Sequence, residues 1–139
     1  MNGDPELALA PLGEAERIAP RNADVPFNLG LAWLGVNRPA EAESAWKRAL
    51  ELAPRHQQAA VNVIDLLIKA GRPSEAETIL TTVRHADLSS PLLDYLEGKL
   101  AILRQDRVAA RASLNRALAG SLPKSVADDA RALLNAIEN

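Results

Sequence analysis

The chain of 139 residues contains no cysteine, and aromatic residues make up only 3% of it. Without cysteine it can form no disulfide, no thiolate nucleophile and no cysteine-ligated zinc site. Because aromatic side chains are so scarce, the core must be built mainly from Leu, Ala, Val and Ile. Small Ala lets helices approach closely while Leu fills the space between them. The composition therefore favours closely packed helices.

The chain also has a small net charge and no long apolar run. The formal net charge is -2 and no basic run exceeds two residues, which argues against a nucleic-acid partner. No apolar run approaches the roughly 18 residues that a membrane helix needs. The first residues also lack the basic-then-apolar order of a signal peptide. We therefore predict neither nucleic-acid binding nor membrane insertion.

Motifs for catalysis or cofactor binding are missing as well. There is no Gly-x-Ser-x-Gly elbow and no glycine-rich phosphate loop. We expect His56 and His85 on the surface near the ends of helices, where the helix dipole favours a cation, and neither has ligands at zinc spacing. Arg104, Arg107 and Arg111 form a mild basic stripe, interpreted as solvated surface, with a phosphate or acidic partner as the alternative. We predict a non-enzyme without cofactor or metal.

What the chain does contain is an internal repeat. The seven residues Asn37–Glu43 (NRPAEAE) recur 34 residues later as Gly71–Glu77 (GRPSEAE), and Gly98 follows Gly30 by two such periods. Apolar residues at helical spacing on both sides of each breaker predict a helix, a turn and a second helix per period. The helices that we expect with definite bounds are 24–35, 39–52, 57–70 and a last helix that ends near 138.

Several residues carry signals for where these helices begin and end. We expect Asp24 and Ser90 to be N-caps, and Ser125–Asp128 to form a capping box for the last helix. Pro91 suits the first position of a helix. Gly71 suits the left-handed conformation that closes one.

The residues at matching positions within the period resemble the tetratricopeptide repeat signature, which has two aromatics, a Leu-Gly pair and a Pro at set places. Here they are Leu29-Gly30, Trp33, Trp46 and Pro54. The resemblance implies an all-α fold, a right-handed α-solenoid of helix–turn–helix repeats. The single domain 1–139 would consist of the second half of a truncated repeat at 1–22, three repeats at 23–56, 57–90 and 91–124, and a capping helix at 125–139. The half-repeat leads us to expect a fragment of a longer protein.

In this family the first helix of each repeat lines a concave groove that holds an extended peptide or a partner's helix. The resemblance therefore implies candidate binding residues at the inward positions of these helices. They are Phe27, Asn28, Leu31, Gln58, Asn62, Asp65, Lys69, Tyr95 and Lys99.

Two known modes of peptide binding can be weighed on the sequence. Members that grip a C-terminal carboxylate use Lys, Asn and Arg at five positions, which here are Phe27, Leu31, Asn62, Leu92 and Leu96. Only Asn62 agrees, and without cations such a clamp cannot work.

The second mode uses a row of side-chain amides, each of which is both donor and acceptor and can bond a peptide backbone. Asn28 and Asn62 lie one period apart and resemble such a row. The alternative is that both amides bond within their own repeats.

The function that we expect is a non-catalytic protein–protein interaction scaffold that binds a peptide or helix in the concave groove. The alternative is a substrate-positioning arm of a larger enzyme, such as a glycosyltransferase, sulfotransferase or hydroxylase. A third hypothesis is self-association through the open N-terminal half-repeat.

Overall fold

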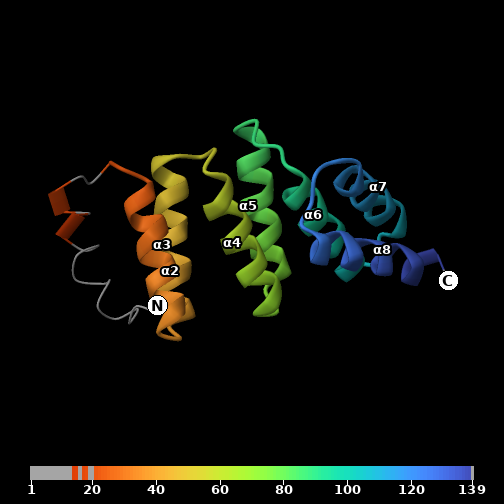
Figure 1. Cartoon of the computed structure of the whole chain (residues 1–139), viewed down its shortest axis with the longest axis horizontal. Coiled ribbons are helices and arrows are strands. Elements are labelled where there is room, and N and C mark those ends of the chain that lie inside the picture. Colours follow the sequence, from red (N-terminus) through yellow and green to blue (C-terminus); the bar gives the residue numbers. More distant parts are fainter. Residues whose placement is uncertain (1–13, 16, 19–20, 139) are drawn as a thin grey trace. The chain divides into compact units, whose positions relative to one another are not determined.

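The structure is a computed structural model that describes residues 14–15, 17–18 and 21–138, and all regular structure in these ranges is α-helical (Figure 1). The predicted half-repeat at 1–22 lies mostly outside the described residues and stays a prediction. No helix in the described part of the chain is long and apolar enough to cross a membrane. The helices with assigned bounds are α2 (Asp24–Gly35), α3 (Pro39–Leu52), α4 (Gln57–Lys69), α5 (Pro73–His85), α6 (Pro91–Leu103), α7 (Arg107–Ala119) and α8 (Lys124–Glu138).

The chain forms two compact units, which comprise residues 1–66 and 67–139. The first contains α2, α3 and most of α4. The second contains the last turn of α4 and the helices from α5 to α8. The expected bounds 24–35 and 39–52 are confirmed, and 57–70 is one residue too long.

The backbone repeats with the same period as the sequence. Asn37, Gly71 and Gln105 follow the first helices of successive repeats, and all three have positive φ, at 60°, 74° and 64°. After the first of them, the Arg38 N–H donates to the Trp33 carbonyl at 2.9 Å, and bonds of equal length follow the other two. This left-handed residue with its long-range bond is a Schellman-type helix end. The prediction for Gly71 is therefore confirmed.

The core of the first unit lies between α2 and α3. Trp46 on α3 is 1% exposed, and its Nε1–H donates to the Phe27 carbonyl on α2 at 3.1 Å. Gly30 makes room for the indole, because a Cβ at that position would lie 2.3 Å from Trp46 Nε1. This tryptophan of the repeat signature therefore packs across the helix pair.

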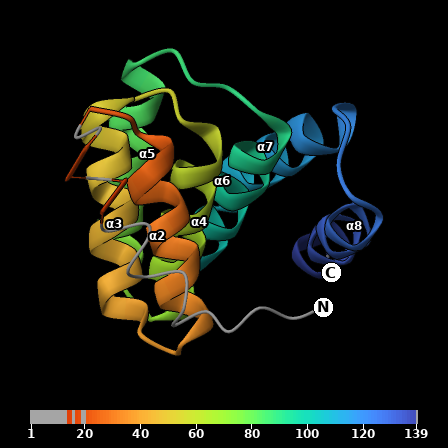
Figure 2. The same ribbon diagram turned by 60° about the vertical axis from the view of Figure 1, so that its left-hand side comes forward.

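The second unit repeats this arrangement between α6 and α7 (Figure 2). Helix α8 contacts α7 as well. A Cβ on Gly98 would lie 2.8 Å from Leu114, two periods after the corresponding pair in the first unit. Ala130 on α8 is fully buried. The last helix therefore closes the apolar side of α7, as expected of a terminal cap.

Ion pairs join α5, α6 and α7 in this unit. The Arg84 guanidinium lies 2.7 Å from an Asp94 oxygen and 3.2 Å from a Glu97 oxygen. Arg116 lies 2.6 Å from the same Glu97 oxygen. The side chains of Arg84, Asp94 and Glu97 are partly shielded from solvent, and that of Arg116 is half exposed. The cluster ties three helices together at one place.

Ser90 caps α6 as predicted, because its side chain accepts a hydrogen bond from the Leu93 N–H at 3.1 Å. The prediction for Asp24 is wrong. It is the first residue of α2, its N–H donates to Asn22 Oδ1 at 3.0 Å, and the N-cap Ala23 makes no side-chain bond. The chain enters the helix one residue earlier than a cap at this aspartate would require.

The capping box expected at Ser125–Asp128 is also wrong. Helix α8 begins at Lys124, where the Ala127 N–H donates to the Pro123 carbonyl, so Ser125 is already inside the helix. Asp128 instead forms an ion pair one turn away, with 2.9 Å between Lys124 Nζ and Asp128 Oδ2. The helix begins earlier than a cap at Ser125 would require, so this side chain is not in the N-cap position.

Candidate peptide-binding surface

Helix α2 has one buried side and one exposed side. Its buried residues include Val25 and Gly30, which face α3. On the other side, Leu31 and Leu34 are 44% and 45% exposed, and Asn28 is exposed one turn before Leu31. Side chains three residues apart lie on the same side of a helix. This surface therefore offers two apolar side chains and an amide, and Leu34 is a member that the sequence analysis missed.

Phe27 precedes Asn28 on α2, and its ring packs against another side chain. Its ring centroid lies 4.9 Å from that of His56, at an interplanar angle of 40°. The ring is half-buried and packs on this neighbour, and its role in binding stays a prediction.

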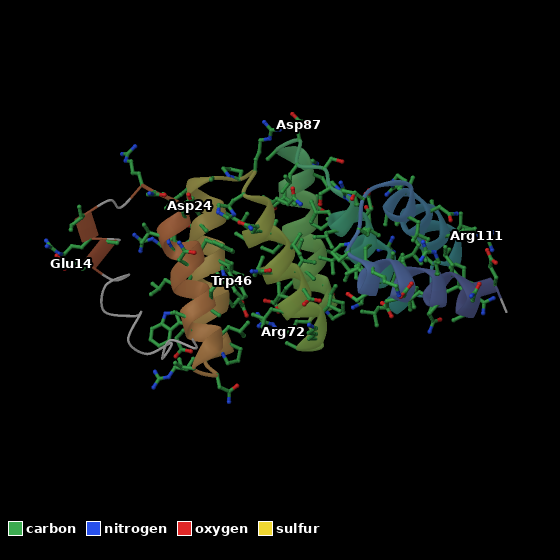
Figure 3. The ribbon with its side chains drawn as sticks, in the orientation of Figure 1. Glu14, Asp24, Trp46, Arg72, Asp87 and Arg111 are labelled. Atoms are coloured by element: carbon green, nitrogen blue, oxygen red, sulfur yellow. The ribbon has the colours of Figure 1, made fainter. Side chains whose placement is uncertain are left out.

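His56 joins α2 to the start of α4. Its Nε2 lies 3.0 Å from Asp24 Oδ1, and its Nδ1 accepts a hydrogen bond from the Ala59 N–H at 3.1 Å (Asp24 is labelled in Figure 3). The imidazole therefore caps α4, and the prediction of a simple surface cation is wrong for this residue. The partner Asp24 is 32 residues away, so no local pattern could indicate the contact. His85 is exposed at the end of α5, as expected.

The candidates on α4 differ in exposure. Gln58 is exposed and, with His56 and Gln57, lines an open depression of about 450 Å³. Asn62 and Asp65 are half-buried. Asp65 interacts with other groups of the chain.

The side-chain amides of the two asparagines of the predicted row make no hydrogen bond in the described part of the chain. Neither the amide of Asn28 nor that of Asn62 has a partner among these residues. The alternative interpretation, that each bonds within its own repeat, therefore lacks support. Because Asn62 is half-buried, its amide is the costlier of the two to leave without a partner.

The remaining candidates lie in the second unit. Lys69 is exposed at the end of α4 and interacts with other groups. On α6, the Lys99 ammonium lies 5.3 Å from the centroid of the Tyr95 ring. The Tyr95 hydroxyl donates to the Asp129 carboxylate on α8. The contact with α8 occupies the polar end of the tyrosine.

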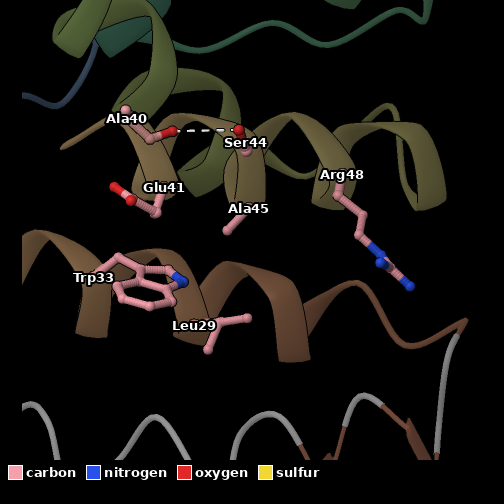
Figure 4. Close-up of a pocket in the computed structure, with 7 residues that line it drawn as sticks. All are labelled: Leu29, Trp33, Ala40, Glu41, Ser44, Ala45 and Arg48. Atoms are coloured by element: carbon pink, nitrogen blue, oxygen red, sulfur yellow. Dashed lines mark hydrogen bonds between the residues drawn. The ribbon is translucent and has the colours of Figure 1, made fainter. Parts of the chain in front are cut away.

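A depression of about 440 Å³ opens between α2 and α3 (Figure 4). Trp33 and Leu29 come from α2, and Ala45 and Arg48 come from α3. The Arg38 guanidinium lies 5.5 Å from the Trp33 ring centroid. The remaining lining residues are Ala40, Glu41 and Ser44.

The repeat assigns a structural role to this depression. Two periods on, the positions of Leu29 and Arg48 are occupied by Glu97 and Arg116. In the second unit these residues pair with each other, and Glu97 also pairs with Arg84 of the preceding helix. From this correspondence we predict that the depression is a stacking face, on which a preceding helix packs in a repeat array.

The ionisable groups are paired across the surface rather than gathered in a pocket. Arg104 pairs with Glu77, and Arg111 Nε lies 3.7 Å from a Glu138 oxygen. Arg107 has no partner in the described ranges. Among the described residues no three His, Asp or Glu side chains come together as a metal site would require. At the exposed N-terminal end, a hydrogen bond from Arg17 lowers the pKa of Glu14.

Two helical hairpins, α2–α3 and α6–α7, lie two periods apart and share the same close contact, and the same turn recurs every 34 residues. These features define an α-helical repeat protein of the solenoid class. Residues 34–100 match the tetratricopeptide repeat family. Over this segment the chain consists of tetratricopeptide repeats.

Solved structures agree with this assignment. YrrB, described as a tetratricopeptide repeat protein with an unusual peptide-binding site, superposes with a TM-score of 0.75 at 18% identity over 91% of this chain. MamA of Desulfovibrio magneticus RS-1 gives 0.69 at 22% over 84%, and PilF of Pseudomonas aeruginosa gives 0.66 at 25% over 81%. The matches cover 63%, 66% and 51% of those chains, so this chain spans about half to two thirds of their length. No curated protein matches the chain.

Proposed function

We propose that the chain is a non-catalytic scaffold that binds an extended peptide segment of a partner protein along α2 and the first part of α4. Repeats of this family mediate protein–protein interactions, which gives the general class of function. The particular ligand and surface are our proposal.

The observation that carries the proposal is the pair of amides at Asn28 and Asn62. They recur at one repeat period on first helices of the same unit, and neither has a hydrogen-bond partner in the described part of the chain. An extended peptide presents backbone N–H and C=O groups at regular intervals, and each amide can serve one of either kind. Binding would thus supply the missing partner of the half-buried Asn62.

Leu31 and Leu34 complete the proposed surface. Exposed Leu side chains three residues apart supply apolar area that a partner's side chains can cover, and each square ångström buried contributes about 25 cal/mol. Backbone bonds to the amides would give affinity with little dependence on sequence. The two leucines would then favour a peptide with apolar residues.

The likeness to YrrB supports the fold and not the ligand, since the identity is 18%. The proposal therefore rests on residues of this chain. The substrate-positioning arm of a larger enzyme stays a prediction, because no contact among the described residues favours it. Self-association through the N-terminal half-repeat also stays a prediction.

The test is affinity capture from a lysate of the source organism with the full chain and with an Asn28→Ala, Asn62→Ala variant. We expect at least one partner to be retained by the parent and lost by the variant, with equal circular dichroism spectra for both. The matched control is Asn115→Ala with Asn135→Ala, two exposed amides of the second unit, which should keep the partner. Equal capture by all three proteins would contradict the proposal.

A further inference from the structure

A second depression lies within the second unit, apart from the surface on α2. Ile102 at the end of α6 and Ala136 and Ile137 at the end of α8 provide its apolar lining. Gln105 of the turn and Arg107, the first residue of α7, provide its polar lining. Its volume is about 450 Å³, which is ample for a bulky side chain.

This depression is not a stacking face. Ile102 and Ala136 occupy the same repeat position on α6 and α8, 34 residues apart, as do Tyr95 and Asp129. Both pairs therefore lie between two successive first helices. The bond between Tyr95 and Asp129 closes the beginning of the space between α6 and α8, and the depression opens at the other end.

Exposed apolar side chains flank the depression along the chain. Leu103, next to Ile102, is 55% exposed, and Val108, next to Arg107, is 79% exposed. In the second unit these are the large apolar side chains of highest exposure among the described residues. The exposed large apolar side chains described for this unit thus both belong to residues next in sequence to lining residues of the depression.

Arg107 is the charged residue in the described lining, and it has no partner among the described residues. Nearby acids are occupied. Asp106 accepts a hydrogen bond from the Ala109 N–H at 3.0 Å as the N-cap of α7, and Glu138 lies 3.7 Å from Arg111. A free guanidinium at the edge of an apolar hollow complements a carboxylate beside an apolar side chain.

We propose that this depression binds a Leu-like side chain of a peptide whose neighbouring acidic residue pairs with Arg107. The inference deepens the proposed function, since it rests on peptide binding by this chain and adds a second subsite with a defined preference. It revises the interpretation of Arg107 as plain solvated surface.

The experiment uses the ¹⁵N-labelled full chain and two amidated peptides of Gly and Ser that carry Leu-Asp or Leu-Lys at their centre, at concentrations up to about 5 mM, where weak subsites are detected. We expect the Leu-Asp peptide to shift the amide signals of Ile102, Gln105 and Ala136, and the Leu-Lys peptide to shift the same signals only at clearly higher concentrations. Arg107→Gln should weaken Leu-Asp binding about fivefold, the effect of one exposed ion pair.

Charge reversal sharpens the test. Arg107→Glu should exchange the preference, so that the Leu-Lys peptide shifts the same signals. Arg55→Glu, an exposed arginine of the first unit, is the matched control and should bind like the parent. Equal binding of both peptides, or no shifts at these signals, overturns the inference. Shifts confined to α2 and α4 overturn it and leave the proposed function standing, because that function is tested separately through Asn28 and Asn62.

Discussion

Gly30 shows how a single residue determines the closest approach of two helices. A Cβ at this position would lie 2.3 Å from Trp46 Nε1 and 2.5 Å from its Cδ1, so the indole occupies the place of a side chain. The tryptophan is rigid and fully enclosed, and it cannot move aside without breaking its bond to Phe27. The equivalent pair in the second unit, Gly98 and Leu114, has a more flexible partner.

We therefore expect Gly30→Ala to lower the free energy of unfolding by about 1 to 3 kcal/mol, the usual cost of overpacking. Helix propensity alone would change stability by about 1 kcal/mol in the opposite direction, so the sign distinguishes the two effects. Urea denaturation monitored by circular dichroism measures it. Gly98→Ala should cost less, because Leu114 can adjust. Stabilisation by Gly30→Ala would contradict the packing.

His56 combines two contacts that substitutions can separate. His56→Ala removes both the cap on the Ala59 N–H and the contact with Asp24, and we expect a loss of about 1 kcal/mol in unfolding free energy. His56→Asn keeps a side chain suited to capping and should lose less. Urea denaturation of the three proteins gives the order. If both variants lose equally, the cap contributes little and the contact with Asp24 dominates.

Among the helices and turns, the turn that ends each first helix recurs with the same geometry. The left-handed position is Asn37, Gly71 and Gln105 in successive repeats. A residue with a Cβ pays about 1 kcal/mol or more for this conformation, and Asn tolerates it better than most. The three turns therefore share one backbone geometry, but their residues differ in how easily they adopt the left-handed conformation.

Gly71→Ala should lower the unfolding free energy by about 1 kcal/mol because of this strain, since nothing lies within 4 Å of the added Cβ. Gly71→Asn, which places there the residue of the first repeat, should cost less. Chemical denaturation of both variants provides the comparison. Equal stability of parent and alanine variant would show that the turn relaxes out of the left-handed region.

The ion cluster of Arg84, Asp94, Glu97 and Arg116 also acts between elements. Glu97→Ala leaves two guanidinium groups near one remaining carboxylate, and we expect a loss of about 1 to 3 kcal/mol in unfolding free energy. Glu75→Ala removes one acid of the exposed pair with Arg72 and should cost less than about 1 kcal/mol. Thermal denaturation at low and high salt compares them. Similar small losses would mean that the cluster is no stronger than a surface pair.

On the scale of the whole chain, each of the two units contains a helical hairpin, and in the second unit the helices on either side, α5 and α8, contact that hairpin. Helix α8 has no second helix after it in the described part of the chain, and it closes α7 through a face that contains Ala130. Its other side carries exposed Asp128 and Arg131. The last helix is thus apolar toward the array and polar toward solvent.

Ala130→Glu should detach α8 and lower the unfolding free energy of the second unit by about 2 to 4 kcal/mol, because a carboxylate would be buried without a partner. Ala132→Glu, the same change at an exposed position of the same helix, should stay within about 0.5 kcal/mol of the parent. Hydrogen exchange resolves the effect by region. Equal protection of α7 in both variants would show that α8 does not stabilise it.

The stacking face around Trp33 provides a prediction for the start of the chain. In the second unit a preceding helix pairs with the equivalent face, and the sequence places residues 1–22 as the second half of a repeat. Deleting residues 1–20 should therefore expose Trp33 and increase quenching of its fluorescence by acrylamide, while buried Trp46 contributes little. Quenching that is unchanged by the deletion contradicts this role of the N-terminal residues. Quenching that decreases as the protein concentration increases would indicate that a second copy of the chain covers Trp33.

The sequence by itself determined the period, the fold class and the bounds of α2 and α3, because these depend on local signals that recur every 34 residues. It also placed the left-handed Gly71 and the cap at Ser90 correctly. The candidate surface on α2 was predicted through Asn28 and Leu31, since a residue's side of a helix follows from its spacing.

Only the tertiary structure decided which polar groups meet. The contacts between His56 and Asp24 and between Tyr95 and Asp129 join residues 32 and 34 positions apart, and the expected caps at Asp24 and Ser125 did not form. Arg104 and Arg111 have carboxylates beside them, from Glu77 and Glu138, whereas Arg107 has no partner among the described residues. The physical reason is that apolar periodicity orients whole helices, whereas a hydrogen bond or ion pair needs two groups within about 3 Å, a distance that only packing sets.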